Sequence, residues 1–308
     1  TNSKCICNLP ISLFPATSCP MTPQPGFTFN AVASRERIAK RIARAGICSR
    51  RDAEARIRDG RVAVNGKIID SPAFNVSPND LVSVDNKPLP KREPARLWRY
   101  YKSCGLIVSS RDEKNRENIF DKLPSHLPRV MTVGRLDIDS EGLLLLTNDG
   151  DLARHLELPS TGWSRKYRVR VKGQVNEQQL VKLTDGVTID GITYGQVVAS
   201  LDRQLSSNAW LTMSIREGKN REIRRIMEHL GHQVSRLIRI SYGPFQLGDL
   251  GDGEVEEIRP RIIADQLGIS LPQGPNDDRP TMTAPKRGKY AHNSRKPPRR
   301  KIDKTRRR

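Results

Sequence analysis

The sequence predicts an α+β protein built from two ordered domains, a small one followed by a larger one that is mixed and mostly β. The first observation is that residues 35–90 show two short helix patterns followed by a hairpin and a further strand. The second is that residues 96–263 hold many strand-length apolar segments with helix patterns among them. With 308 residues, the chain is long enough to bury two cores.

The first domain begins with two helices whose ends are marked in the sequence. Residues 37–45 place apolar residues on one face and cations on the adjoining one, and Gly46 stops the helix. Ser49 can then cap a second helix over residues 50–59, because its hydroxyl accepts a hydrogen bond from a free backbone N–H of the first turn. Gly60 ends that helix.

A β-hairpin follows the two helices. Residues 61–64 and 67–69 are joined by Asn65-Gly66, a dipeptide that favours the tight turn of a two-residue hairpin. Residues 81–84 add another strand. The domain is therefore expected to fill residues 35–90.

The second domain follows a proline-rich stretch whose end, residues 91–95, is expected to be a stiff linker. Strands are expected at 96–101, 106–109, 142–147, 167–171, 195–201, 210–215 and 234–240. Helices are expected at 117–122, 150–157, 176–184 and 220–230. The domain should end near Ile263, with a short extension to residue 267.

Both ends of the chain have the composition of disordered segments. Residues 1–34 lack helix or strand periodicity and make a poor secretory signal, and Met21 offers an alternative start. Residues 264–308 are expected to form a disordered basic tail. No segment approaches the roughly 18 apolar residues that a membrane span needs, so no membrane partner is expected.

The net charge of +20 indicates a polyanionic partner. The charge is concentrated at the end of the chain, because residues 284–308 hold twelve Lys or Arg and one Asp. Such an arm can bind RNA non-specifically through counterion release, although a tail that only aids solubility is the alternative.

Neither a metal site nor a cofactor is expected. The five cysteines form no CxxC pair and no His/Cys cluster with ligand spacing. There is no P-loop and no GxGxxG. A scattered, odd set of cysteines is typical of a reducing compartment, so the protein is expected to be cytoplasmic.

The two helices of the first domain carry a dense set of cations with little acidic compensation. Nucleic-acid contact is the favoured interpretation, and a merely solvated helix face is the alternative. The members of this basic patch are Arg37, Lys40, Arg41, Arg44, Arg50 and Arg51.

The most informative segment of the chain is residues 133–142, directly before the apolar run 143–147. A short, charged turn here places the carboxylate of Asp137 beside a segment apolar enough to be a buried strand. A carboxylate in that position is poorly solvated and has a fixed direction, which are conditions under which Asp can act as a nucleophile. An Asp that only caps a strand is the alternative.

This segment resembles the signature of RNA pseudouridine synthases. Gly134-Arg135-Leu136-Asp137, followed by 141–150, is similar to the bacterial branch that modifies small- and large-subunit rRNA. Segments 166–169, 218–227 and 236–244 agree with that branch in order and spacing. The resemblance covers about residues 35 to 262. It implies an S4-type RNA-binding domain followed by a catalytic domain with a mixed, mainly antiparallel sheet and flanking helices.

Asp139 and Glu141 are the local alternatives to Asp137. The resemblance implies that Asp137 is the essential carboxylate, and leaves open whether it attacks C1′ or deprotonates the sugar. Strand alternation alone would make Tyr167 a core residue. The resemblance instead implies that its ring stacks on the target uracil and that its hydroxyl is available for proton transfer.

The helix expected at 220–230 carries three arginines, Arg221, Arg224 and Arg225. An ionised Asp in a dry pocket needs a nearby cation, and the family motif points to Arg224 as the partner of Asp137, with Arg225 as the neighbouring alternative. A purely RNA-facing role for these arginines stays open. The resemblance further implies that Ile223 and Leu237 wall the pocket and that Arg135 grips RNA.

The sequence therefore predicts a cofactor-free rRNA pseudouridine synthase that acts on a flipped uridine. The basic C-terminal tail resembles that of enzymes acting on large-subunit (23S) rRNA, so free 23S rRNA or a pre-ribosomal particle is the expected partner. High like charge favours a monomer. The alternatives are a non-catalytic ribosome-assembly factor that binds RNA and a general S4-type RNA chaperone.

Overall fold

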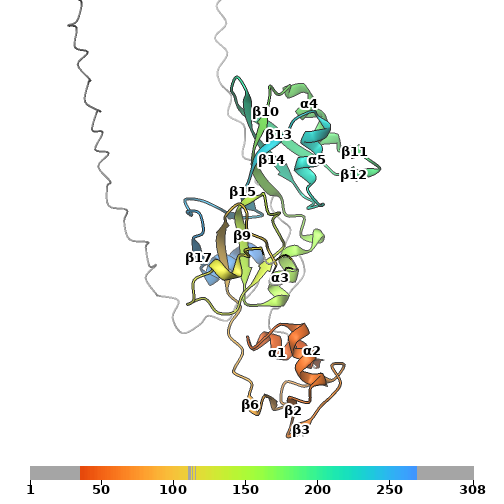
Figure 1. The fold of residues 1–308 in the computed structure, drawn as a ribbon, viewed down its shortest axis with the longest axis vertical. Coiled ribbons are helices and arrows are strands. Elements are labelled where there is room, and N and C mark those ends of the chain that lie inside the picture. The colour runs from red at the N-terminus through yellow and green to blue at the C-terminus, as the bar shows by residue number, and fades with distance from the viewer. Residues whose placement is uncertain (1–34, 110–111, 113, 115, 269–308) are drawn as a thin grey trace, which may run out of the picture. The chain divides into compact units, whose positions relative to one another are not determined.

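The computed structural model describes residues 35–109, 112, 114 and 116–268 (Figure 1). The residues predicted to be a disordered N-terminal extension, and the basic tail from residue 269 onward, lie outside this range. Of the described residues, none belongs to a helix long and apolar enough to cross a membrane.

The first ordered part contains two helices and six short strands. The helices are α1 (Ile38–Arg44) and α2 (Arg50–Arg58), and the strands are β1 (Glu36–Arg37), β2 (Val62–Val64), β3 (Lys67–Ile68), β4 (Asn75–Val76), β5 (Val82–Val84) and β6 (Lys87–Pro88). Four of the strands form a sheet in the order β3-β2-β5-β6, and β1 pairs with β4. Strand β6 shows that the proline-rich stretch begins inside this sheet.

The local signals of this part act as predicted. Ser49 Oγ accepts a hydrogen bond from Asp52 N at 3.1 Å, and the Asp52 carboxylate bonds back to Ser49, which closes a capping box on α2. Asn65 and Gly66 have φ of 50° and 80°, the left-handed conformation that the tight hairpin turn requires. Ile38 and Ile42 are fully buried in the core beneath the helices.

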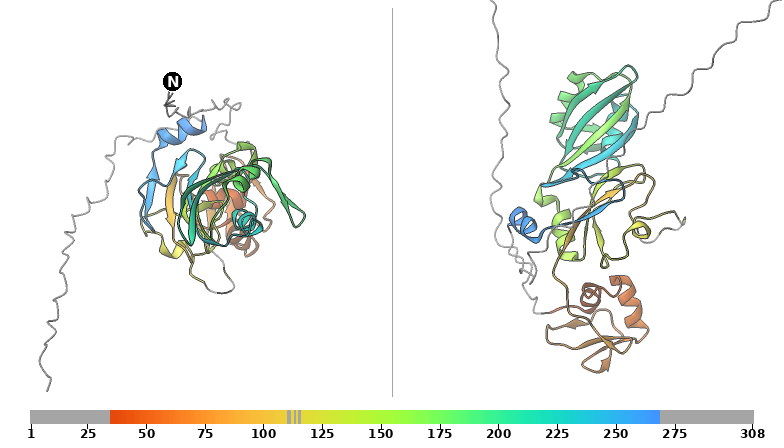
Figure 2. Two further views of the ribbon diagram at one scale, coloured as in Figure 1. Left: turned by 90° about the horizontal axis from the view of Figure 1, so that it is seen from above. Right: turned by 90° about the vertical axis from the view of Figure 1, so that its left-hand side faces the viewer.

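The second ordered part is built on one large sheet. Its strands are β7 (Leu97–Lys102), β8 (Met131–Val133), β9 (Glu141–Thr147), β10 (Arg165–Lys172), β13 (Val197–Gln204), β14 (Asn208–Ile215), β15 (Val234–Tyr242), β16 (Phe245–Gln246) and β17 (Val255–Ile258). The main path runs β13-β14-β10-β15-β9-β7-β17. Only β15 and β9 are parallel neighbours on it, so the predicted mixed, mainly antiparallel sheet is confirmed (Figure 2).

Helices pack on both sides of this sheet, at different places. They are α3 (Gly150–Glu157), α4 (Glu177–Lys182), α5 (Glu222–His229) and α6 (Pro260–Leu267). Apolar residues of α4 and α5 share a core with one face of β10 and β14, and in Figure 1 both helices lie together beside these strands. Apolar residues of α3 and α6 form a separate core with β9. The opposite face of β10 and β14 therefore receives neither α4 nor α5.

Several sequence predictions for this part are wrong. Residues 106–109 form no strand but a single bridge between Ile107 and Asn118, and the helix expected at 117–122 is one 3₁₀ turn, Phe120–Lys122. The hairpin β11 (Val187–Ile189) and β12 (Ile192–Tyr194) was not predicted, nor were β8 and β17. These elements have only three or four residues per strand, too few to show a clear alternation, and β17 in addition pairs with a strand that is distant in sequence.

The start of the predicted disordered tail is also corrected. Helix α6 continues to Leu267, so residues 264–267 are helical. Pro260 occupies the first helical turn, where its missing N–H costs nothing, and Ile263 is fully buried. Leu267 packs against the core that α3 and β9 share.

Candidate active site

A cleft of about 940 Å³ opens on the side of the sheet that carries α5. Its volume lies at the upper end of the range for small-ligand sites. The lining residues include Arg135, Asp137, Tyr167, Arg221, Ile223, Leu237 and Arg239. Six of these seven were predicted as site residues.

Asp137 lies in the loop between β8 and β9, as its sequence position predicted. The strand after the loop is buried along Leu143–Leu146, so the loop is anchored at one end in the core. The loop closes on itself through a hydrogen bond from Ser140 N to Asp137 O at 3.1 Å. At its start, Gly134 N donates to Glu157 Oε1 at 2.6 Å. The carboxylate thus has a defined place in the cleft.

A buried lysine holds the far half of this loop. Lys102 Nζ donates to the carbonyl oxygens of Ser140 at 2.8 Å, Ser103 at 3.0 Å and Ile138 at 3.4 Å. Its side chain is fully buried, and among the described residues no carboxylate forms an ion pair with it. Burial therefore lowers the pKa of Lys102 to about 8, against the opposing charge of nearby groups that include Asp137. Sequence reasoning did not identify this residue.

Three apolar or aromatic side chains form the walls. Tyr167 on β10, Ile223 on α5 and Leu237 on β15 are each buried and all line the cleft. Tyr167 also belongs to the hydrophobic core, so it is both the core residue that strand alternation predicts and part of the cleft wall. The ring is one wall of the space beside Asp137.

The expected pair between Arg224 and Asp137 is not formed. Arg224 Nη2 donates to Asp139 O at 2.7 Å and Nη1 to Val234 O at 3.2 Å. Arg221 bonds the Asp139 carboxylate at 3.1 Å. Burial opposes ionisation of Asp139, but the hydrogen bond from Arg221 and the charge of Arg224 outweigh it and lower the pKa. Arg224 is therefore a positioning group for the loop.

Arg239 is a buried cation of the cleft that sequence reasoning missed. Its side chain is only 2% exposed, and Nε donates to Leu143 O at 2.7 Å. Its Nη2 is buried and has no hydrogen-bond partner in the described part of the chain. Leu237 and Arg239 are two residues apart on β15, so they share a face of the strand, and this alternation was the available signal.

Gly142 makes the position of Arg239 possible. Strands β9 and β15 approach so closely here that a Cβ on Gly142 would lie 2.4 Å from Arg239 O, and the φ of +100° favours glycine. Any larger residue at position 142 would therefore push the two strands apart.

The remaining predicted arginines lie at the surface. Arg135 is exposed and lines the cleft. Arg225 is exposed on α5 and does not line the cleft, so it does not replace Arg224 as a partner for Asp137. Within the described ranges, no group of His, Cys, Asp or Glu side chains is arranged to hold a metal ion.

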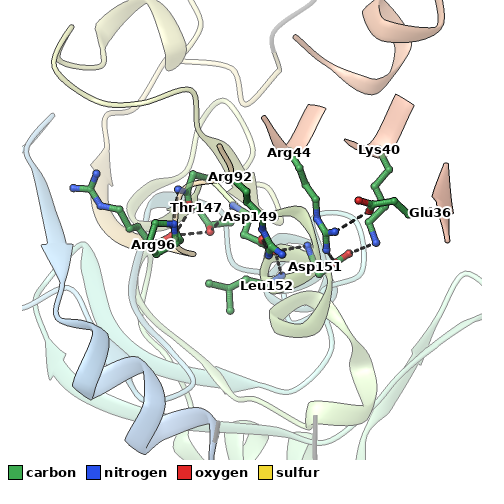
Figure 3. Close-up of polar contacts among 11 residues, drawn as sticks. Glu36, Lys40, Arg44, Arg92, Arg96, Thr147, Asp149, Asp151 and Leu152 are labelled. Atoms are coloured by element: carbon green, nitrogen blue, oxygen red, sulfur yellow. Dashed lines mark hydrogen bonds and ion pairs between the residues drawn. The ribbon is translucent and has the colours of Figure 1, made fainter. Parts of the chain in front are cut away.

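Half of the predicted basic patch is engaged within the protein. Arg41 and Arg44 pair with Glu36, and Lys40 and Arg44 both reach Asp151 at the start of α3 (Figure 3). Asp149 caps the same helix, accepting from Asp151 N and Leu152 N, and binds Arg92 at 2.5 Å. The exposed members without an ion pair among the described residues are Arg37, Arg50 and Arg51.

Comparison with known proteins identifies the family. The model for RNA pseudouridylate synthase matches residues 96–229, and the S4 domain model matches residues 36–82. An RNA pseudouridine synthase of Rickettsia bellii is 49% identical over 228 residues, which cover 74% of this chain and 98% of the relative. The chain belongs to the RNA pseudouridine synthase family. It is therefore an isomerase that acts on RNA, with an S4 domain before its catalytic domain.

Two further pseudouridine synthases extend the comparison. Ribosomal large subunit pseudouridine synthase B of Bacillus subtilis is 36% identical over 231 residues, covering 74% of this chain and 94% of the relative. A crystal structure of a pseudouridylate synthase matches with a TM-score of 0.52 and 25% identity over 76% of this chain and 100% of that one. The fold of this family, predicted from the motifs, is confirmed.

Proposed function

We propose that this pseudouridine synthase modifies a uridine of large-subunit (23S) rRNA, free or in a pre-ribosomal particle, with Asp137 as its catalytic carboxylate. The observation that carries the proposal is that Asp137, Tyr167 and Arg239 line one cleft. The rRNA substrate is supported by similarity to the Bacillus subtilis large-subunit enzyme and by the net charge of +20.

The reaction needs only groups that the cleft holds. The bond from N1 to C1′ breaks, the bond from C5 to C1′ forms, and C5 loses a proton while N1 takes one up, so no atom is added overall. Attack at C1′ and removal of a sugar proton both require an ionised carboxylate, which is the role of Asp137. The buried guanidinium of Arg239 stabilises negative charge in the same cleft.

The walls hold the detached base. Once its bond to C1′ breaks, the uracil must turn to present C5 without leaving the site. The ring of Tyr167 offers a stacking surface, and the aliphatic side chains of Ile223 and Leu237 enclose the base. The Tyr167 hydroxyl is proposed to relay the proton that leaves C5.

The target uridine reaches the cleft by leaving its RNA stack. Extraction of a base costs a few kcal/mol, which RNA contacts around the site must offset. Arg135 is exposed and lines the cleft, and it is proposed to occupy the gap that the nucleotide leaves. The S4 domain and other basic surfaces then contribute affinity through phosphate contacts.

Pseudouridine mapping on rRNA tests this proposal. Carbodiimide modification and primer extension are compared between cells with wild-type protein, cells without it, and cells with Asp137→Asn or Asp139→Asn. A 23S site lost in the deletion and in Asp137→Asn, but kept in Asp139→Asn, supports the proposal. The Asp137→Asn protein should still bind 23S rRNA.

Each other outcome of the mapping experiment would contradict a specific part of the proposal. A site that persists in Asp137→Asn but is lost in Asp139→Asn identifies the other carboxylate of the loop. A lost site in 16S rRNA would contradict the large-subunit assignment. Persistence of every site in the deletion, with defective ribosome assembly, would favour an RNA-binding assembly factor.

A further inference from the structure

Strand β10 presents two different surfaces. Tyr167, Val169 and Val171 are buried toward the cleft and the core that includes α5. The residues between them point to the other side of the sheet, where most are exposed. We call this side the open face and define it by Lys166, Arg168, Arg170 and Lys172 of β10, Arg203 of β13, Trp210 of β14 and Arg236 of β15.

The open face contains a continuous cross-strand row. Arg203 pairs with Trp210, Trp210 with Arg170, and Arg170 with Arg236 across four adjacent strands. Arg168, from the next row, places its guanidinium carbon 4.9 Å from the centroid of the Trp210 ring. Three arginines and an aromatic ring therefore lie side by side, with a fourth arginine stacked on that ring.

Little negative charge balances these residues. Across the described strands, six open-face cations face two carboxylates. Glu141 pairs with Arg236, and Asp202 accepts a hydrogen bond from Thr212. Arg170 and Arg236 are directly opposite each other, an arrangement of like charges that destabilises a sheet. Arg170 Nε is also buried without a hydrogen-bond partner in the described residues. The face is thus costly unless an anion covers it.

We propose that the open face binds RNA phosphates, as a second contact for the RNA whose uridine enters the cleft. This inference rests on the proposed function, because only a large RNA can contact both sides of the sheet. Guanidinium forks fit phosphate oxygens in a bidentate manner. The partly exposed ring of Trp210, already stacked with Arg168, can also stack on an unpaired base. An acidic protein segment would use the charge but not the ring.

Salt-dependent binding to a full-length 23S rRNA transcript tests the open face. The variant Arg168→Gln/Arg203→Gln removes two exposed cations from it. Each lost phosphate contact lowers the slope of log affinity against log salt by about 0.7 to 0.9, so the slope falls by roughly 1.6. The affinity ratio between wild type and variant then changes about ten-fold between 50 and 200 mM KCl.

The control variant Arg154→Gln/Lys182→Gln removes the same charge from exposed positions on α3 and α4. Its salt slope should match that of wild type. An open-face variant that keeps the wild-type slope overturns the proposal. Pseudouridine formation on the transcript at saturating enzyme is measured in parallel and should be unchanged. If wild type binds the transcript but modifies nothing, the proposed rRNA function fails while the slope still reports on the open face.

Chemical protection gives a second, independent measurement on the wild-type chain. Lys166 and Lys172 of the open face should be shielded from acetic anhydride when the 23S transcript is bound, whereas Lys182 should react as in the free protein. Equal reactivity of Lys166 and Lys172 with and without RNA would contradict the inference, whatever the variants do.

Discussion

The two sides of strand β10 use arginine in opposite ways. On the cleft side, Arg239 is buried and Arg224 is held by backbone carbonyls, so each guanidinium has one direction. On the open face, Arg168 and Arg203 are exposed and, within the described residues, have no carboxylate partner. One sheet therefore holds buried, fixed cations on one side and, on the other, exposed cations such as Arg168 and Arg203.

This difference has a physical meaning for function. A fixed, desolvated cation stabilises developing charge without reorganising during the reaction, so it contributes to rate. An accessible cation exchanges counterions for phosphates, so it contributes salt-dependent affinity. Substitutions on the cleft side should therefore change the rate or the fold, and those on the open face should change binding.

The largest loss of stability is expected at Gly142, where the backbones of β9 and β15 approach closely. Gly142→Ala should lower the free energy of unfolding by roughly 4 kcal/mol, because the new Cβ meets the carbonyl of Arg239 at a left-handed φ. Urea unfolding measures this loss. Gly134→Ala is the matched control, since its φ is +68° but nothing lies within 4 Å of the new Cβ. It should cost about 1 kcal/mol. Equal losses would mean that backbone strain alone, and not the approach of β15, decides the cost.

The next prediction distinguishes the cleft side from the open face by the rate of pseudouridine formation. Arg239→Gln should slow single-turnover pseudouridine formation about 10²- to 10³-fold, because it removes a preorganised charge from the cleft. The rate is measured on the 23S transcript by release of tritium from C5 of labelled uridine. Arg236→Gln, three residues earlier and on the open face, is the control and should keep the wild-type rate at saturating enzyme. A similar loss of rate in both variants would show that catalysis and RNA binding are not separated between the two sides.

The fold was predictable wherever a local signal decides it. Helix α3 has the bounds that its periodicity predicts, and the Asn65-Gly66 turn fixes the first hairpin. Strand β17 was missed because four residues with two central glutamates show no alternation, and its pairing with β7 joins segments about 160 residues apart. Such an element is determined by its partner, which the local sequence does not contain.

The sequence motifs predicted which residues line the site, but not which groups those residues contact. Asp137, Tyr167 and Leu237 lie in one cleft as the motifs predicted. The family motif pointed to Asp137 as the partner of Arg224, but a motif gives the order of residues and not the group that lies across from a helix, and Arg224 binds the carbonyls of Asp139 and Val234. Arg239 escaped notice because an arginine in a strand is usually exposed. Its burial depends on Gly142 and on a bulge that shifts the pairing between Lys166 and Tyr167.

The last prediction concerns Lys102, the buried cation under the Asp137 loop. Its pKa is about 8 in the folded chain, against 10.5 for an ordinary lysine. Between these values the folded protein has released a proton that the unfolded chain still binds, so a rise in pH favours folding. Relative to Lys102→Met, wild type should gain at most about 1.4 kcal/mol per pH unit, or roughly 2 kcal/mol from pH 8 to 10.

Urea unfolding at pH 8, 9 and 10 measures this gain, and differences from Lys102→Met cancel the titration of other groups. Lys166→Met is the matched control, because it removes a lysine from the open face instead of the cleft side. If stability rises with pH relative to Lys102→Met but not relative to Lys166→Met, the two sides differ in proton binding as well as in rate. Only the desolvated lysine would then release a proton on folding. A constant difference between wild type and Lys102→Met would mean that the three carbonyls stabilise the ammonium enough to offset its burial. In that case a permanent positive charge would lie beneath the Asp137 loop, and Lys102 would join Arg239 among the fixed cations on the cleft side of the sheet.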